Sequence, residues 1–134
     1  MEKAIAIFVI INFTIMGLSH MIQREAWREF FAALHAMGRP GAFANGFLAL
    51  VMGSLIVSLH NIWSGIPVIL TLIGWAYIAK STVIFLSPEL GLRSIGRVQA
   101  KSAKQFVFAG VGLVLISALL LGCVLTGVYD APIV

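Results

Sequence analysis

The stretch from residue 40 to residue 79 reads PGAFANGFLALVMGSLIVSLHNIWSGIPVILTLIGWAYIA and contains no Asp, Glu, Lys or Arg. A helix needs about 20 apolar residues to cross the hydrocarbon core of a bilayer, so this stretch is long enough for two crossings. Polar and turn-forming residues cluster at 60–67, and Trp63 there suits the headgroup level. We therefore predict two spans at about 43–59 and 67–85.

Apolar segments also lie near both ends of the chain. The residues from 4 to 23 carry no charge, and a second apolar run is followed by Tyr129, a residue typical of membrane interfaces. We predict further spans at about 4–22 and 106–128. The expected fold is all-α: an integral membrane four-helix transmembrane bundle, with residues 1–134 as a single domain.

Composition supports the same class of protein. The chain has 134 residues, of which 60% are hydrophobic and 10% are charged, whereas about 25% are charged in typical soluble domains. A soluble protein of this size has too little interior to bury so much apolar surface. The single cysteine, Cys123, excludes a disulfide within the chain.

The first long connection predicts an amphipathic helix at about 24–37. Its apolar residues recur at the spacing of one helix face, and its charges fill the first turns. The apolar set is Trp27, Phe30, Phe31 and Leu34, and the charged set is Arg24, Glu25, Arg28 and Glu29. An aromatic stripe opposite a charged face is typical of a helix that lies in the membrane interface.

The second long connection is basic. Arg93, Arg97, Lys101 and Lys104 recur every three or four residues, so they form one stripe if the segment is helical. With Arg24 and Arg28 of the first connection, we expect them to contact lipid headgroups. The net charge of +4 falls in these connections, which favours an anionic membrane surface over nucleic acid as the partner.

The positive charges also predict an orientation. Of nine Lys and Arg, only Lys3 lies outside the two long connections and their borders. The positive-inside rule then places both connections in the cytoplasm. We expect a multi-pass protein of the bacterial inner (plasma) membrane, with both termini outside the cytoplasm.

Small residues indicate where helices approach closely in lipid. The second span has Gly46, Ala49 and Gly53 on nearly one face, and the fourth has Gly110, Gly112, Ala118 and Gly122. We expect these two helices to meet, within the chain or across a dimer. The order of span, amphipathic segment and span occurs twice, which suggests a parallel internal repeat, although any two apolar hairpins resemble each other.

Polar residues inside spans are the candidates for function: Asn12, Ser54, Thr71 and Lys80. Asn12 either lines a ligand cavity or, as we favour, bonds across helices to Ser54, Thr71 or Ser117. Lys80 either binds an anion or, the favoured reading, extends to the headgroups. The predicted spans contain no Asp or Glu, which argues against proton-driven export.

The histidines offer a weak haem hypothesis. His20 and His35 fall on the same side of the membrane, whereas His60 falls on the other. No cysteine or carboxylate cluster has metal-ligand spacing, and the Ser–His pairs 19–20 and 58–60 do not face one another on a helix. We predict no catalytic residue, no metal site and no cofactor.

Two motifs carry a resemblance to known proteins: GLSHMIQREAW at 17–27 and HNIWSGIPVILTLIGW at 60–75. They resemble a group of small, uncharacterised bacterial inner-membrane proteins, and the four-span layout is similar to the DoxX-like families. The resemblance implies the fold, but it carries no functional residue over to this chain.

Three functions remain open. The favoured one is a non-enzymatic membrane protein that binds a lipid, a quinone or a partner membrane protein. The second is an oligomeric small-solute transporter or channel with Asn12, Ser54 and Thr71 on its pathway. The third is a haem- or quinone-linked redox subunit that uses His20 and His35. Expected partners are the bilayer and further copies or subunits of a membrane complex.

Overall fold

The computed structural model describes residues 1–130, and these form six helices and no strand. The long helices are α1 (Glu2–Ile22), α3 (Arg39–Leu59), α4 (Val68–Leu86) and α6 (Ala103–Leu125), and the short ones are α2 (Arg24–Ala36) and α5 (Pro88–Gln99). All four long helices are apolar and long enough to cross a membrane. This confirms the predicted all-α class with four helices of spanning length.

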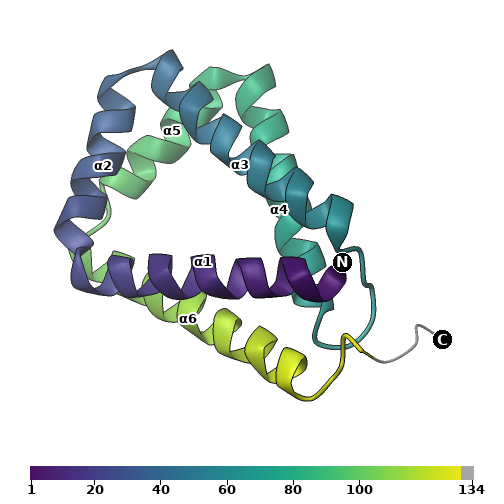
Figure 1. The fold of residues 1–134 in the computed structure, drawn as a ribbon. Coiled ribbons are helices and arrows are strands. Elements are labelled where there is room, and N and C mark those ends of the chain that lie inside the picture. Colours follow the sequence, from purple (N-terminus) through teal and green to yellow (C-terminus); the bar gives the residue numbers. More distant parts are fainter. Residues whose placement is uncertain (131–134) are drawn as a thin grey trace.

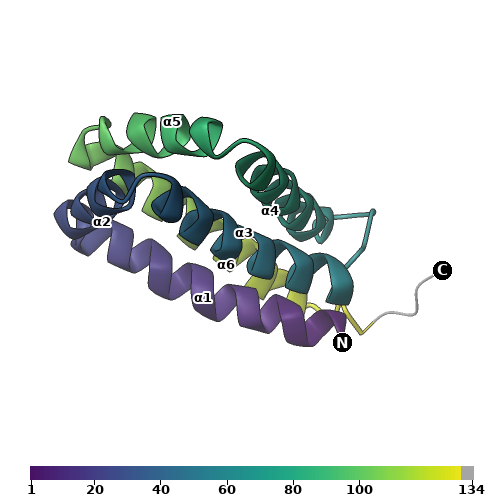
Figure 2. The same cartoon turned by 90° about the horizontal axis from the view of Figure 1, so that it is seen from above.

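The helices pack in three pairs that form the sides of a triangle (Figure 1). α1 lies against α6, α3 against α4, and α2 against α5. The first three helices form one layer and the last three form the other (Figure 2). Each half of the chain thus consists of a long, a short and a long helix. A two-fold axis that exchanged the two halves would exchange α1 with α4, α2 with α5 and α3 with α6, and it would produce the observed pairs.

The molecule has two opposite ends. The connector end is the side formed by α2 and α5. The terminal end is the opposite corner, where the N-terminus, the 60–67 turn and residue 130 come together (Figure 1).

Backbone chemistry sets the helix boundaries at the connector end. Gly38 has a φ of 66°, a left-handed conformation that glycine adopts without steric cost, and Pro40 follows in the first turn of α3. α3 therefore begins at Arg39, four residues before the expected start. Pro88 begins α5 in the same way.

The predicted basic stripe is broken. α5 ends at Gln99, so Arg93 and Arg97 lie on it, whereas Lys101 lies in the following turn and Lys104 lies in the first turn of α6. The stripe required one continuous helix, and the chain turns at 100–102 instead.

Glycines bring the backbones of the long pairs close together. A methyl group added to Gly17 would lie 2.8 Å from the carbonyl oxygen of Gly110, and one added to Gly53 would lie 2.9 Å from that of Gly74. The glycines of the second span therefore pack on α4, and Gly110 packs on α1. The expected contact between the second and fourth spans is wrong within the chain, because small-residue patterns do not specify the partner helix.

Apolar clusters hold the corners of the triangle. The cluster towards the terminal end joins α1, α3, α4 and α6 through Ala6, Val9, Phe13, Ile56, Leu70 and Leu120. The cluster at the connector end joins α2, α3, α4 and α5 through Leu34, Ala42, Ile84 and Ile95. The third corner, between α2 and α6, is joined by Phe31 and Phe106. The sides of the triangle meet at its three corners, and this leaves space at the centre.

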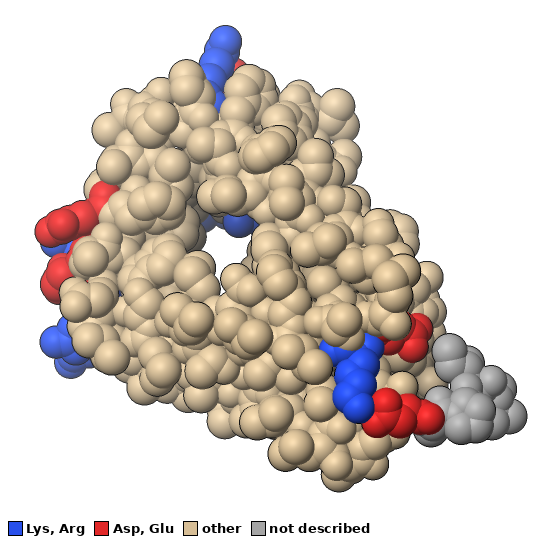
Figure 3. Space-filling view, in the orientation of Figure 1, with Lys and Arg blue, Asp and Glu red and all other residues tan. Residues whose placement is uncertain are grey.

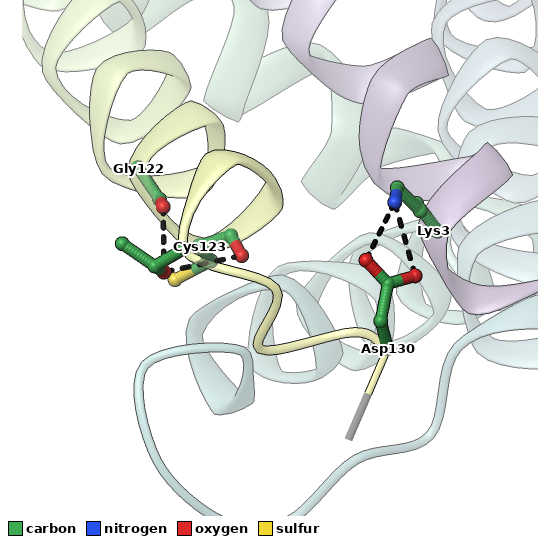
Figure 4. Close-up of polar contacts among 5 residues, drawn as sticks. Lys3, Gly122, Cys123 and Asp130 are labelled. Carbon is green, nitrogen blue, oxygen red and sulfur yellow. Dashed lines mark hydrogen bonds and ion pairs between the residues drawn. The ribbon is translucent and has the colours of Figure 1, made fainter. Parts of the chain in front are cut away.

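An ion pair connects the two ends of the described chain. The Lys3 amine contacts both carboxylate oxygens of Asp130, at 2.7 and 3.0 Å (Figure 4). Asp130 reaches this position because the chain turns back after α6, with Gly127 at a φ of 73°.

Candidate functional site: the cavity between the helix pairs

A cavity of about 360 Å³ lies between the three helix pairs. Figure 3 shows the opening at the centre of the molecule, bordered mainly by uncharged residues, with a small basic patch visible at its upper edge. α1, α2 and α3 supply most of the lining, and Tyr77, Lys80 and Leu113 complete it from α4 and α6. The 13 residues of α2 span about 20 Å, which keeps the two long pairs apart at the connector end.

Aromatic residues of α2 form one wall of this cavity: Trp27, Phe30 and Phe31. The rings of Trp27 and Phe30 meet edge to face with their centroids 5.6 Å apart, and the Trp27 indole donates a hydrogen bond to the Ser19 hydroxyl at 2.9 Å. Phe31 also approaches Phe106 of α6. Of the four residues of the predicted stripe, Leu34 is buried, Trp27 and Phe31 are half-buried, and Phe30 is exposed.

His20 is held at the edge of the cavity. Its ring stacks on Trp27 with the centroids 3.9 Å apart, and its Nδ1 lies 2.7 Å from the carbonyl oxygen of Met16. His35 lies in the last turn of α2, eight residues beyond Trp27 and therefore about 12 Å along the helix. The structure does not bring the two imidazoles together, as a shared haem iron requires.

The described residues also offer no other metal site in place of His20 and His35. Within residues 1–130, no three His, Cys, Asp or Glu side chains come close enough to hold a metal ion.

Asn12 lines the cavity, but its hydrogen bond differs from the expected one. Its amide donates to the carbonyl oxygen of Phe8, one turn earlier in α1, at 2.8 Å. The polar contact between α1 and α6 is made by the hydroxyls of Thr14 and Ser117 instead, and Ser117 also donates to the carbonyl oxygen of Ile10. The favoured interhelical bond of Asn12 is therefore wrong.

Lys80 lies where two cavities meet. It lines the central cavity and also a second one of about 280 Å³ between α4 and α5, together with Gly91 and Ser94. The ion pairs within residues 1–130 join Lys3 to Asp130, Arg28 to Glu25 and Arg39 to Glu89, and none includes Lys80.

Ser54 and Thr71 do not line the central cavity. Ser54 is exposed on α3 and donates to the carbonyl oxygen of Leu50 at 2.7 Å. Thr71 is buried near the terminal end, where its hydroxyl donates to the carbonyl oxygen of Ile62 at 2.7 Å. The predicted pathway of Asn12, Ser54 and Thr71 is not assembled in one place.

The six basic residues expected at headgroups share one location. Arg24, Arg28, Arg93, Arg97, Lys101 and Lys104 are all exposed at or beside the connector end. Lys101 also borders a third cavity, of about 200 Å³, with His20 and Phe106.

The sequence did not indicate a buried cluster at the terminal end. His60 is 1% exposed, its Nδ1 lies 3.2 Å from the Thr71 hydroxyl, and its ring meets Tyr129 edge to face. Burial lowers the pKa of His60 below its ordinary value, and burial raises the pKa of Tyr129 to about 12. The His60 Nε2 and the Tyr129 hydroxyl have no hydrogen-bond partner within residues 1–130. The spacing of residues in the sequence could not indicate that His60 and Tyr129 meet, because they lie far apart in the chain.

Comparison of the chain with protein-family models, curated proteins and solved structures gave no match. The functional argument therefore rests on the cavity itself. It combines an aromatic and aliphatic lining with polar side chains, namely the amides of Asn12 and Asn45, the imidazole of His20, the phenol of Tyr77 and the amine of Lys80. Such a lining suits a ligand that is mostly apolar and has a polar group at one end.

Proposed function

We propose that this protein is a non-enzymatic binding protein of the bacterial plasma membrane that takes an amphiphile, a lipid or a quinone, into its central cavity. The observation that carries the proposal is the cavity between the three helix pairs. Its volume of about 360 Å³ falls within the range of about 300–1,000 Å³ that is typical of small-molecule sites.

In the proposed arrangement, α1, α3, α4 and α6 cross the bilayer, and α2 and α5 lie along its cytoplasmic surface. Large apolar side chains such as Ile15, Phe47 and Phe108 are exposed on the long helices, where lipid chains would cover them. The basic residues at the connector end would meet anionic headgroups, and both termini would lie outside the cytoplasm.

The surroundings of the cavity favour an apolar occupant. Apolar cavities do not hold water well, and the wall formed by Trp27, Phe30 and Phe31 offers it little hydrogen bonding. In a bilayer, hydrocarbon chains surround the molecule, and the opening at its centre gives them access (Figure 3). Asn12 and Asn45 can form hydrogen bonds with the polar group of an amphiphile. A plain hydrocarbon has no such group and would leave both amides without a partner.

Native mass spectrometry of the protein released from a mild detergent tests the proposal. The wild-type protein should carry the added mass of one amphiphile. Leu48→Trp places an indole in the cavity and should remove that mass, because Leu48 is exposed and lines the cavity. Leu72→Trp is the matched control, since Leu72 is similarly exposed on α4 but lies outside the lining.

Two results would contradict the proposal. One is a wild-type protein that carries no amphiphile after gentle release from lipid nanodiscs. The other is a Leu48→Trp variant that keeps the same added mass as Leu72→Trp.

A further inference from the structure

We propose that the amphiphile is an anionic phospholipid whose headgroup is bound by Lys80, at the junction between the central cavity and the cavity between α4 and α5. This inference rests on the proposed function, because it names the class of ligand that the same cavity takes.

The first argument is the position of the charge. Lys80 lies six residues before the end of α4, about 9 Å along the helix axis. A cation at that depth of an apolar span is costly unless it reaches the headgroups or meets an anion. Within residues 1–130 it has no carboxylate partner, unlike Lys3, Arg28 and Arg39.

The second argument is the cover that α5 provides. The neighbours of Lys80 in the second cavity include Leu90, Gly91 and Ser94 of α5, which packs beside the end of α4. An added methyl group on Gly91 would lie 3.1 Å from Ile84, so the two helices pack closely there. Lys80 and Ser94 are both exposed beside this cavity, and the cavity has room for a headgroup within reach of the amine.

The third argument is the arrangement of neutral polar groups around the amine. Asn45 and Asn12 line the central cavity, and the Ser94 hydroxyl lines the second one. A phosphate at the junction can accept a charge-assisted bond from Lys80 and further bonds from these amides and this hydroxyl. The acyl chain then extends along the apolar lining of the central cavity, which includes Phe13 and Leu48 of the long helices.

Net charge selects among phospholipids. A zwitterionic headgroup brings its own cation, which repels Lys80 and offsets the attraction to the phosphate. A phosphatidylglycerol headgroup carries one uncompensated negative charge. Lys80 lies within an apolar span, so hydrocarbon surrounds it in the proposed arrangement, and this difference has a larger effect there than at the basic residues of the connector end.

Trp27 provides a reporter for the experiment, because it lies in the cavity wall. Trp63→Phe and Trp75→Phe, both at exposed positions, leave it as the single tryptophan. The protein is placed in phosphatidylcholine nanodiscs that contain a minor fraction of phospholipid with brominated acyl chains, a quencher of indole fluorescence. Brominated phosphatidylglycerol should quench Trp27 several-fold more than the same fraction of brominated phosphatidylcholine.

Lys80→Gln should abolish this preference, and Lys80→Arg should restore it. Lys3→Gln is the matched control, because it removes the same charge at the terminal end and should leave the preference intact. Circular dichroism of each variant checks that the helices are retained, and Lys80→Arg keeps the test valid if Lys80→Gln misfolds.

Two results would overturn the inference. If both brominated lipids quench Trp27 equally while Leu48→Trp still removes the bound mass, the cavity binds an amphiphile without regard to charge, and only the proposed function stands. If the preference persists in Lys80→Gln, the basic residues of the connector end select the lipid and Lys80 does not. Loss of the bound mass from the wild-type protein would instead contradict the proposed function.

Discussion

The terminal end and the central cavity differ in how their charged side chains are paired. At the terminal end Lys3 pairs with Asp130, and Thr71 bonds to the Ile62 carbonyl and to His60, although the His60 Nε2 and the Tyr129 hydroxyl have no partner within residues 1–130. At the cavity, Lys80 has no protein anion within residues 1–130, and Asn12 bonds only within its own helix. Polar groups that are satisfied internally stabilise a fold, whereas unpaired ones in an apolar setting are available to a ligand.

The largest effect is expected where the long helices touch. Gly110→Leu should destabilise the protein by about 3 kcal/mol or more, because its side chain would collide with the backbone of Gly17 and with His20. Gly112→Leu on the same helix has open space and should change the unfolding free energy by less than about 0.5 kcal/mol. Thermal unfolding in detergent measures both. Equal losses of stability would show that α1 and α6 do not pack through Gly110.

An intermediate effect is expected at the terminal end. Thr71→Val removes the hydrogen bond to the Ile62 carbonyl and the contact with His60, and it should cost about 1–3 kcal/mol of unfolding free energy. Binding of the amphiphile should stay unchanged, because Thr71 lies outside the cavity lining. Ser54→Ala, at an exposed position, is the neutral control. A Thr71→Val variant that has normal stability but binds no amphiphile would contradict this prediction, because it would assign ligand binding to the terminal end.

The smallest effect is a dependence of stability on pH. Since burial lowers the pKa of His60 in the folded protein, the unfolded chain binds this proton more readily. Stability should therefore be constant above the ordinary histidine pKa of about 6.5 and decrease as the pH falls from there through the lower pKa of the folded protein. His60→Gln should remove this decrease, and His35→Gln, at an exposed position, should retain it. Melting temperatures from pH 8 downwards measure the effect. If stability still decreases at low pH in His60→Gln, another titratable group causes the decrease.

Part of the candidate site was accessible to sequence reasoning. Asn12 and Lys80 were singled out because a polar group in an apolar span is costly, and both line the cavity. The aromatic residues of α2 were recognised as one face, but that face was assigned to the interface. The place of Leu48 and Tyr77 in the cavity lining could not be predicted. An apolar or aromatic residue in a span gives the same sequence pattern whether it faces lipid, a neighbouring helix or a cavity.

The order of the helices follows from local chemistry alone. Hydrophobic length, charge placement and the breaks at Gly38, Pro40 and Pro88 are properties of consecutive residues. They are sufficient to predict four long apolar helices and a short helix between the first two. Helix pairing is a property of surfaces distant in sequence. Spacing could not predict that Gly17 meets Gly110, that His60 meets Tyr129, or that Lys80 borders two cavities. The central cavity exists because three helix pairs meet only at their corners, and this arrangement arises only when the whole chain packs.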